Sequence, residues 1–233
     1  MPKRCEQDLH AVWKAVADMG YAGVEFAGYY GRSAPEMRKL LDDHGLTGCG
    51  THLQLNHLEG DELKRTIEYN QTLGNPYLIV AWMPPAYAKS LESVKEAAQK
   101  YNEVAEQLKP LKMYVGYHAH GGDFHKIGDD TAWDLLFENT CDDVIMQLDI
   151  GNCLGGGGDP YATLKRFPGR RDLVFHLHPA AKPACPRYPV DETGILEYPR
   201  SQIIVAIGLR PPPPSGSHKH RRDLSGERRQ FLS

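Results

Sequence analysis

The sequence lacks the features that define several large classes of protein. None of its apolar runs approaches the roughly 20 residues that are needed to cross a membrane. Its five cysteines are scattered and form no Cys-x-x-Cys pair, which argues against a cysteine-based zinc site and predicts reduced thiols. The amino-terminal segment MPKRCEQDLH has no apolar signal core, so we expect a cytoplasmic protein.

Motifs for binding nucleic acids and nucleotides are also missing. The 233 residues carry a net charge of −3, which gives no overall positive field to attract nucleic acid. No G-x-G-x-x-G or P-loop sequence follows any of the strand-like segments. The composition, 41% hydrophobic and 24% charged, is that of a globular domain. We therefore expect neither nucleic acid nor a membrane as a partner.

The chain does contain a regular alternation of strand-like and helix-like segments. Short β-branched or aromatic runs predict strands at 23–26, 47–53, 77–82, 113–120, 144–150 and 173–178. Segments with apolar residues at helical spacing predict helices at 9–19, 34–44, 61–73, 90–108, 129–139 and 160–167. This rhythm predicts a parallel α/β sheet. Polar residues end at least four of the strands, which favours a (β/α)8 TIM-type barrel over a doubly wound sheet.

The predicted barrel is incomplete. A closed barrel of this type needs eight strands, but the chain opens on a helix without a first strand, and its last strand, at 202–207, is weakly marked. We assign residues 1–200 to the barrel domain and predict a disordered, Pro/Arg-rich tail at 201–233. A partner-binding arm or a shifted reading frame would also account for the composition of the tail. An open barrel leaves unpaired strand edges, which favours homo-oligomers.

Several segments together resemble the xylose isomerase-like barrel superfamily of sugar phosphate isomerases and epimerases. In order, they are GYAGVEFAGYYGRSAPEMRKLLDDHGL, Thr51-His52, GYHAHGGDF, MQLDIGNCLGGGGDP and VFHLH, over about residues 8–200. The resemblance is strongest to the branch with a Tyr-His-Asn-His motif, of which this chain has Tyr-His-Ala-His at 117–120. The resemblance implies an isomerase or epimerase that acts on a sugar or sugar phosphate through an enediolate intermediate. It also implies one divalent metal ion as cofactor (manganese, magnesium, cobalt or zinc).

Three residues are candidate metal ligands. Asp149 ends an otherwise apolar strand, where a carboxylate is costly to bury unless it is paired or bound to a metal. It also matches the superfamily's Asp-x-Gly-His ligand motif, with Asn152 in place of the histidine. His176 matches the first histidine of the superfamily's His-x-Lys-Asp motif, and His118 stands where many relatives have a glutamate ligand. The glutamate of the superfamily's eighth strand has no counterpart here. For each candidate, a hydrogen-bonded structural residue is the alternative.

The candidate catalytic bases are Glu25, His118 and His120. Glu25 interrupts the apolar run Val-Glu-Phe, and a buried glutamate requires a partner. His118 and His120 are separated by one residue on a predicted strand, so both side chains should face the same way.

The candidate substrate contacts are His52, Trp82, Asp123 and His178. His178 replaces the lysine of the His-x-Lys-Asp motif, and core packing is the alternative for Trp82.

Two other functions fit the same sequence. One is a metal-dependent lyase or dehydratase that acts on a keto-sugar or inosose and expels a hydroxyl group from the same intermediate. The other is a truncated, catalytically inactive barrel, which the missing first strand and the unusual carboxyl-terminal region favour.

Overall fold

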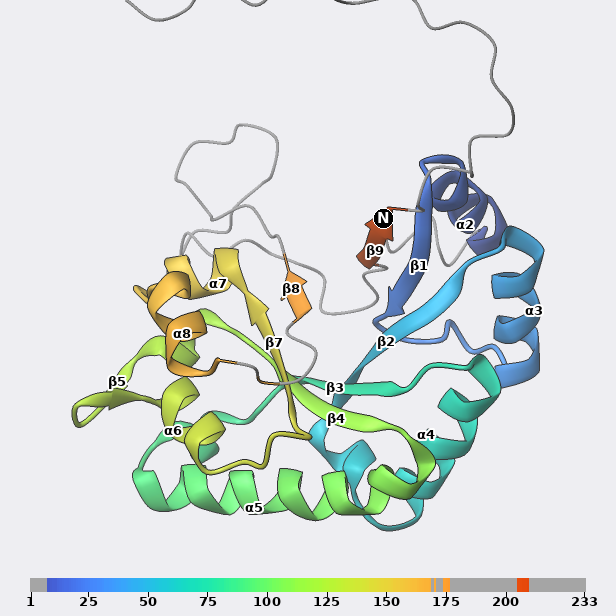
Figure 1. Cartoon of the computed structure of the whole chain (residues 1–233). Helices are drawn as coiled ribbons and strands as arrows, with labels where there is room; N and C mark the ends of the chain where they lie inside the picture. The colour runs from blue at the N-terminus through green and yellow to red at the C-terminus, as the bar shows by residue number, and fades with distance from the viewer. Residues whose placement is uncertain (1–7, 169, 171–173, 177–204, 210–233) are drawn as a thin grey trace, which may run out of the picture.

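The protein forms a curled, largely parallel sheet with helices along its outer side (Figure 1). The computed structural model describes residues 8–168, 170, 174–176 and 205–209. The strands of the main sheet are β1 (Tyr21–Phe26), β2 (Thr47–Gln54), β3 (Tyr77–Trp82), β4 (Tyr114–His118), β7 (Ile145–Asp149), β8 (Val174–His176) and β9 (Val205–Leu209). Their order in the sheet is β8-β7-β4-β3-β2-β1-β9.

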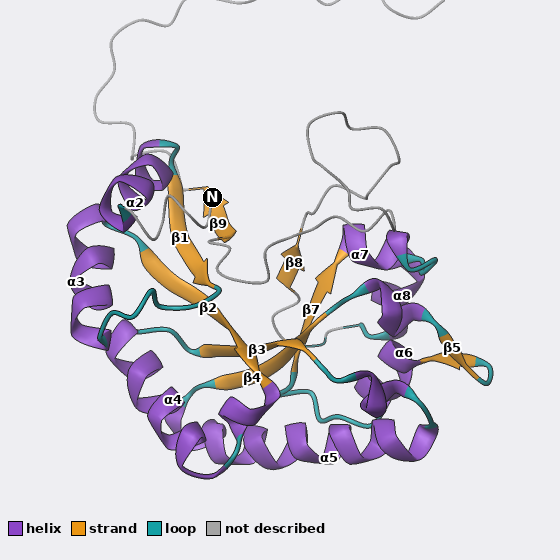
Figure 2. Ribbon diagram, turned by 180° about the vertical axis from the view of Figure 1, so that it is seen from behind, coloured by secondary structure: helices purple, strands orange, loops and turns teal. Residues whose placement is uncertain are grey.

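The helices are α2 (Leu9–Asp18), α3 (Ala34–His44), α4 (Gly60–Leu73), α5 (Leu91–Leu108), α6 (Ala132–Glu138), α7 (Ile150–Gly155) and α8 (Pro160–Arg166). Short 3-10 turns η1 (Leu55–Leu58), η2 (Pro85–Ala88), η3 (Lys109–Leu111) and η4 (Gly121–Phe124) lie between them, and β5 (Lys126–Ile127) pairs with β6 (Asp130–Thr131). Figure 2 shows the helices around the convex side of the sheet. Among the described residues, no helix is long and apolar enough to cross a membrane.

Local sequence signals explain where several helices begin and end. Ser33 and Glu36 form a capping box before α3, with the Ser33 backbone N–H donating to Glu36 Oε2 at 2.8 Å. Gly45 ends that helix in the left-handed conformation, at φ 59°. The helix predicted at 129–139 begins only at Ala132, because Asp130 and Thr131 pair with β5 instead. Helix α7, directly after β7, was not expected from the sequence.

The six predicted strands all overlap strands of the structure, and β1 to β8 of the main sheet pair in parallel. The last predicted strand, at 202–207, overlaps β9, but β9 runs antiparallel to β1, with Tyr21 opposite Leu209. It therefore pairs with the outer edge of β1 without extending the parallel series. Such pairing satisfies backbone groups that an incomplete barrel would leave exposed at that edge. The rest of the predicted tail lies outside the described residues.

Two apolar clusters separate the sheet from its helices. One packs β1 against α2 and α3, and its buried members include Trp13, Val24, Phe26 and Leu41. The larger cluster packs the middle strands against α5 and α6, around Trp133 and its neighbours. Burial of such aromatic and aliphatic side chains is the main source of stability in a fold of this kind.

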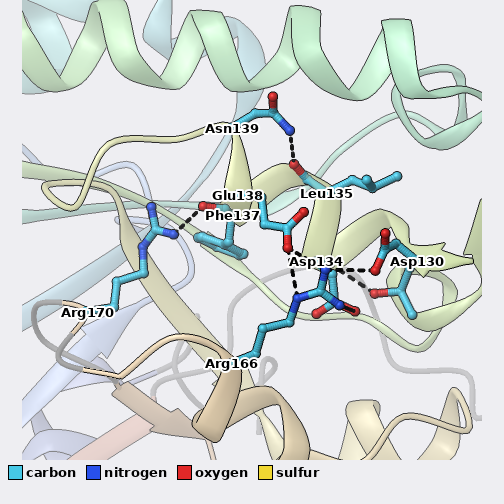
Figure 3. Close-up of polar contacts among 9 residues, drawn as sticks. Asp130, Asp134, Leu135, Phe137, Glu138, Asn139, Arg166 and Arg170 are labelled. Atoms are coloured by element: carbon cyan, nitrogen blue, oxygen red, sulfur yellow. Dashed lines mark hydrogen bonds and ion pairs between the residues drawn. The ribbon is translucent and has the colours of Figure 1, made fainter.

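Two arginines, Arg166 at the end of α8 and Arg170 just after it, contact residues of α6 (Figure 3). Arg166 of α8 forms ion pairs with Asp130 at 2.7 Å, with Asp134 at 3.3 Å, and with Glu138. Arg170 donates to the carbonyl oxygen of Phe137 at 2.5 Å, which covers the carboxyl-terminal end of α6. These contacts hold α8 against α6 on the outer side of the sheet.

Candidate functional site

Polar side chains from four strands meet on the concave side of the sheet. Glu25 of β1, His52 of β2, His118 of β4 and Gln147 of β7 form one hydrogen-bonded cluster, which we call the interior cluster. The Gln147 amide donates to Glu25 Oε1 at 2.7 Å, although β4, β3 and β2 lie between their two strands. This contact is made only because the sheet curls as a barrel does.

The two histidines of the interior cluster share one acceptor. His52 Nε2 lies 2.9 Å from Gln147 Oε1 and 3.2 Å from Glu25 Oε2. His118 Nδ1 lies 2.8 Å from the same Gln147 Oε1, and the two imidazole rings are 4.8 Å apart between centroids. The predicted residues Glu25, His52 and His118 are thus brought together in one place.

Gln147 was missed by the sequence analysis, which treated the rest of the strand before Asp149 as apolar. Its side chain is 1% exposed. The signal was present, because residues two apart on a strand face the same side, and Gln147 precedes Asp149 by two. Gln147 and Asp149 therefore lie on the same face of β7.

Glycine makes room for the Glu25 carboxylate. Gly50 of β2 is the backbone partner of Glu25, and a Cβ atom at that position would lie 2.3 Å from Glu25 Oε1. That distance is far inside van der Waals contact. The missing side chain therefore allows a carboxylate to lie over β2 and reach Gln147.

His120 lies beside the interior cluster but not on a strand. The strand predicted at 113–120 ends at His118, because the chain turns into η4 at Gly121. The rings of His118 and His120 remain close, 5.0 Å between centroids. Burial lowers the pKa of His120, which favours its neutral form and suits a proton acceptor.

Asp123 occupies a different environment on the helix side of β4. Its carboxylate accepts hydrogen bonds from the Tyr117 hydroxyl at 2.9 and 3.0 Å and from the His120 backbone N–H at 2.6 Å. Burial raises the pKa of Asp123 to about 6, although these hydrogen bonds act in the opposite direction. Its expected contact with substrate remains a prediction.

The three candidate metal ligands lie on adjacent strands. Asp149 is 1% exposed and accepts a hydrogen bond from the Asn152 backbone N–H at 2.7 Å, which caps α7. Asp149 is the backbone partner of His176 on β8, and His118 on β4 is the partner of Gln147. Among the side chains that the structure describes, no group of three or more His, Cys, Asp or Glu residues could hold a metal ion. The His176 side chain lies outside that set.

The remaining candidates are Trp82 and His178. Trp82 ends β3 and is 52% exposed, so it is not part of the buried core, and its contact with substrate stays a prediction. His178 lies outside the described residues.

Comparisons with solved structures show the same fold in other proteins. A sugar phosphate isomerase/epimerase from Parabacteroides distasonis ATCC 8503 is 19% identical, with 85% of this chain and 76% of that chain covered and a TM-score of 0.64. A second sugar phosphate isomerase/epimerase from the same organism is 21% identical, with 71% of each chain covered and a TM-score of 0.62. A D-psicose 3-epimerase, solved in the presence of D-fructose, is 13% identical, with 72% of this chain and 66% of that chain covered and a TM-score of 0.54.

No curated protein matches the chain. Residues 13–199 match the family model for the xylose isomerase-like TIM barrel. Since this match includes every strand of the parallel series, from β1 to β8, the chain belongs to the xylose isomerase-like TIM barrel family.

Proposed function

We propose that this protein is an isomerase or epimerase that acts on a sugar or sugar phosphate. The observation that carries the proposal is the interior cluster, in which a buried glutamate and two histidines meet at the carboxyl ends of parallel barrel strands. That end of the barrel is where enzymes of this fold have their active sites. Similar folds named as sugar phosphate isomerase/epimerase and D-psicose 3-epimerase support the reaction class.

Glu25 is the proposed base. Its carboxylate removes a proton from the carbon next to the substrate carbonyl, and the electrons of the broken C–H bond form an enediolate. Return of the proton to the neighbouring carbon gives an isomer, and return to the opposite face of the same carbon gives an epimer. His52, 3.2 Å from Glu25 Oε2, orients the carboxylate. His120, which burial favours in its neutral form, is the candidate for a second proton transfer.

We also propose one divalent metal ion, manganese, magnesium, cobalt or zinc, held by His118, Asp149 and His176. Imidazole and carboxylate groups suit these ions. The strand pairing supports the set, since Asp149 is opposite His176 and β4 is next to β7. When bound, such an ion polarises the carbonyl oxygen and stabilises negative charge on it. The proposal includes four substrate contacts, His52, Trp82, Asp123 and His178. It also includes a cytoplasmic location and the formation of homo-oligomers.

Solvent exchange tests the reaction directly. The full chain is incubated in D2O with a panel of aldoses, ketoses and their phosphates, with each of the four ions in turn, and followed by proton NMR. We expect deuterium at the carbon next to the carbonyl, together with an isomer or epimer, and loss of both after EDTA treatment. Release of water from a keto-sugar would instead assign the lyase reaction. A folded, metal-treated protein that exchanges no proton of any substrate would contradict the proposal and favour an inactive barrel.

A further inference from the structure

The amide of Gln147 is the centre of the interior cluster. It is 1% exposed, and β7, its strand, lies between β4 and β8. Its Oε1 faces two imidazole nitrogens, His52 Nε2 at 2.9 Å and His118 Nδ1 at 2.8 Å. Its Nε2 donates to Glu25 Oε1 at 2.7 Å.

The two ends of an amide are chemically different, and this fixes where the protons are. Oε1 only accepts hydrogen bonds and Nε2 only donates them. The nitrogens of His52 and His118 that face Oε1 must therefore carry protons. The reverse orientation of the amide would place Oε1 against the Glu25 carboxylate, two acceptors at 2.7 Å. Burial makes such an arrangement unfavourable, because water is not present to separate the two groups.

We propose that Gln147 is a positioning residue that sets the tautomers of both histidines. It holds His118 as the Nδ1–H tautomer and His52 as the Nε2–H tautomer. The ring lone pairs are then on His118 Nε2 and His52 Nδ1. The use of these atoms in catalysis rests on the proposed function, whereas the tautomers themselves do not.

The consequence for the site is a defined division of roles. A histidine can act as a ligand or base only through the ring nitrogen that carries no proton. For His118 that atom is Nε2, because Nδ1 donates to Gln147. His52 instead directs its N–H at both Gln147 and Glu25, so it acts as a donor within the cluster. The Gln147 amide thus leaves His118 with an acceptor nitrogen for the site and makes His52 a donor within the cluster.

Glutamine is the residue type that meets these requirements at position 147. A glutamate would keep oxygen acceptors for the histidines but would place a second carboxylate against Glu25. A methionine of similar length would offer neither the acceptor nor the donor. These two substitutions therefore separate the contact with the histidines from the contact with Glu25.

The test is nitrogen-15 NMR of the imidazole rings in the full chain without substrate. In the unsubstituted protein, we expect the His118 signal to show a proton on Nδ1 and the His52 signal to show a proton on Nε2. In Gln147→Met, His118 should lose its preference for Nδ1–H, whereas Gln147→Glu should retain it. Gln107→Met, the same change on the exposed side of α5, should leave both rings unchanged.

Each outcome decides the proposal. A proton on His118 Nε2 in the unsubstituted protein overturns it, and this measurement needs no variant, so a misfolded variant does not prevent a decision. Unchanged tautomers in a folded Gln147→Met protein also overturn it. The expected tautomers together with no exchange on any sugar would support the role of Gln147 and contradict the proposed function alone.

Discussion

Two adjacent residues of β2, Thr51 and His52, belong to two different buried polar clusters. His52 points into the interior cluster with Glu25, His118 and Gln147. Thr51 points to the helix side, because successive side chains on a strand alternate. There, the Thr51 hydroxyl donates to Asn70 Oδ1 at 2.9 Å and accepts from Asn75 Nδ2, also at 2.9 Å.

The helix-side cluster is completed by Tyr29, whose hydroxyl lies 3.1 Å from Thr51 Oγ1 and 3.2 Å from Asn70 Oδ1. Burial raises the pKa of Tyr29, so its hydroxyl stays neutral. All four groups, Tyr29, Thr51, Asn70 and Asn75, are uncharged and bonded to one another. Such a network stabilises the packing of α4 on the sheet without burying a charge.

The interior cluster is chemically different, because it buries a carboxylate and two imidazoles. Such groups are costly to remove from water, and a well-packed neutral arrangement often stabilises a fold as well or better. The comparison shows that buried polarity alone does not identify a functional site. What distinguishes the interior cluster is titratable chemistry at the carboxyl ends of the strands.

The largest expected effect is a loss of activity on substitution of Glu25 in the interior cluster. Glu25→Gln keeps an oxygen acceptor for Gln147 but removes the proposed base, so the exchange rate should fall by about 100- to 10,000-fold. Its stability should change by no more than about 1 kcal/mol, because a buried charge is removed while most of the packing stays. Exchange kinetics and urea unfolding measure the two quantities.

Glu96→Gln, the same change on the exposed side of α5, is the matched control and should alter neither quantity. Full exchange activity in Glu25→Gln would remove Glu25 from the reaction. A large loss of stability instead would place the interior cluster in the same structural class as the helix-side cluster.

The helix-side cluster should respond in the opposite way. Asn70 is 0% exposed, accepts at Oδ1 from the other three members, and donates to the Thr66 carbonyl oxygen at 2.8 Å. Asn70→Leu leaves several buried groups without partners, so we expect a loss of about 3–5 kcal/mol in the free energy of unfolding. The activity per folded molecule should stay close to that of the unsubstituted protein.

Urea unfolding and single-turnover exchange below the unfolding range measure these effects. Gln107→Leu on the exposed side of α5 is the control and should change stability by less than about 0.5 kcal/mol. A loss of activity in the folded fraction of Asn70→Leu would show that the two clusters are coupled through β2.

The sequence predicted the strands and helices well because the apolar periodicity and the caps are local. The helix predicted at 34–44 is an example, because the capping box at Ser33 and Gly45 mark its two ends. The sequence named Glu25, His52 and His118 as site candidates, and the fold brings them together because parallel strands place their carboxyl ends side by side. The direction of β9 did not follow, because edge pairing with β1 involves residues nearly 190 positions apart and no local signal records it. The spacing of two from Asp149 placed Gln147 on the same face of the strand, but its partners Glu25, His52 and His118 come from other strands and are known only from the fold.

Asp123 is a titratable group on the helix side of the sheet, so it tests whether a buried charge is confined to the interior cluster. It is 9% exposed and bound to Tyr117 and the His120 backbone. Burial raises its pKa in the folded protein from 3.8 to about 6. Between these two values the folded protein binds more protons than the unfolded chain, so the free energy of unfolding falls as the pH rises. The fall should amount to about 3 kcal/mol from this group.

Asp123→Asn removes this titration and replaces it with a loss that does not depend on pH. The stability of the variant relative to the unsubstituted protein should therefore improve by about 3 kcal/mol from pH 3 to pH 7. Thermal or urea unfolding at several pH values measures the difference, with exposed Asp129→Asn as the control. Parallel stability curves for Asp123→Asn and the unsubstituted protein would show that Asp123 stays ionised in the fold. The helix side of β4 would then tolerate a buried charge as readily as the interior cluster does, and charge would no longer separate the two sides of the sheet.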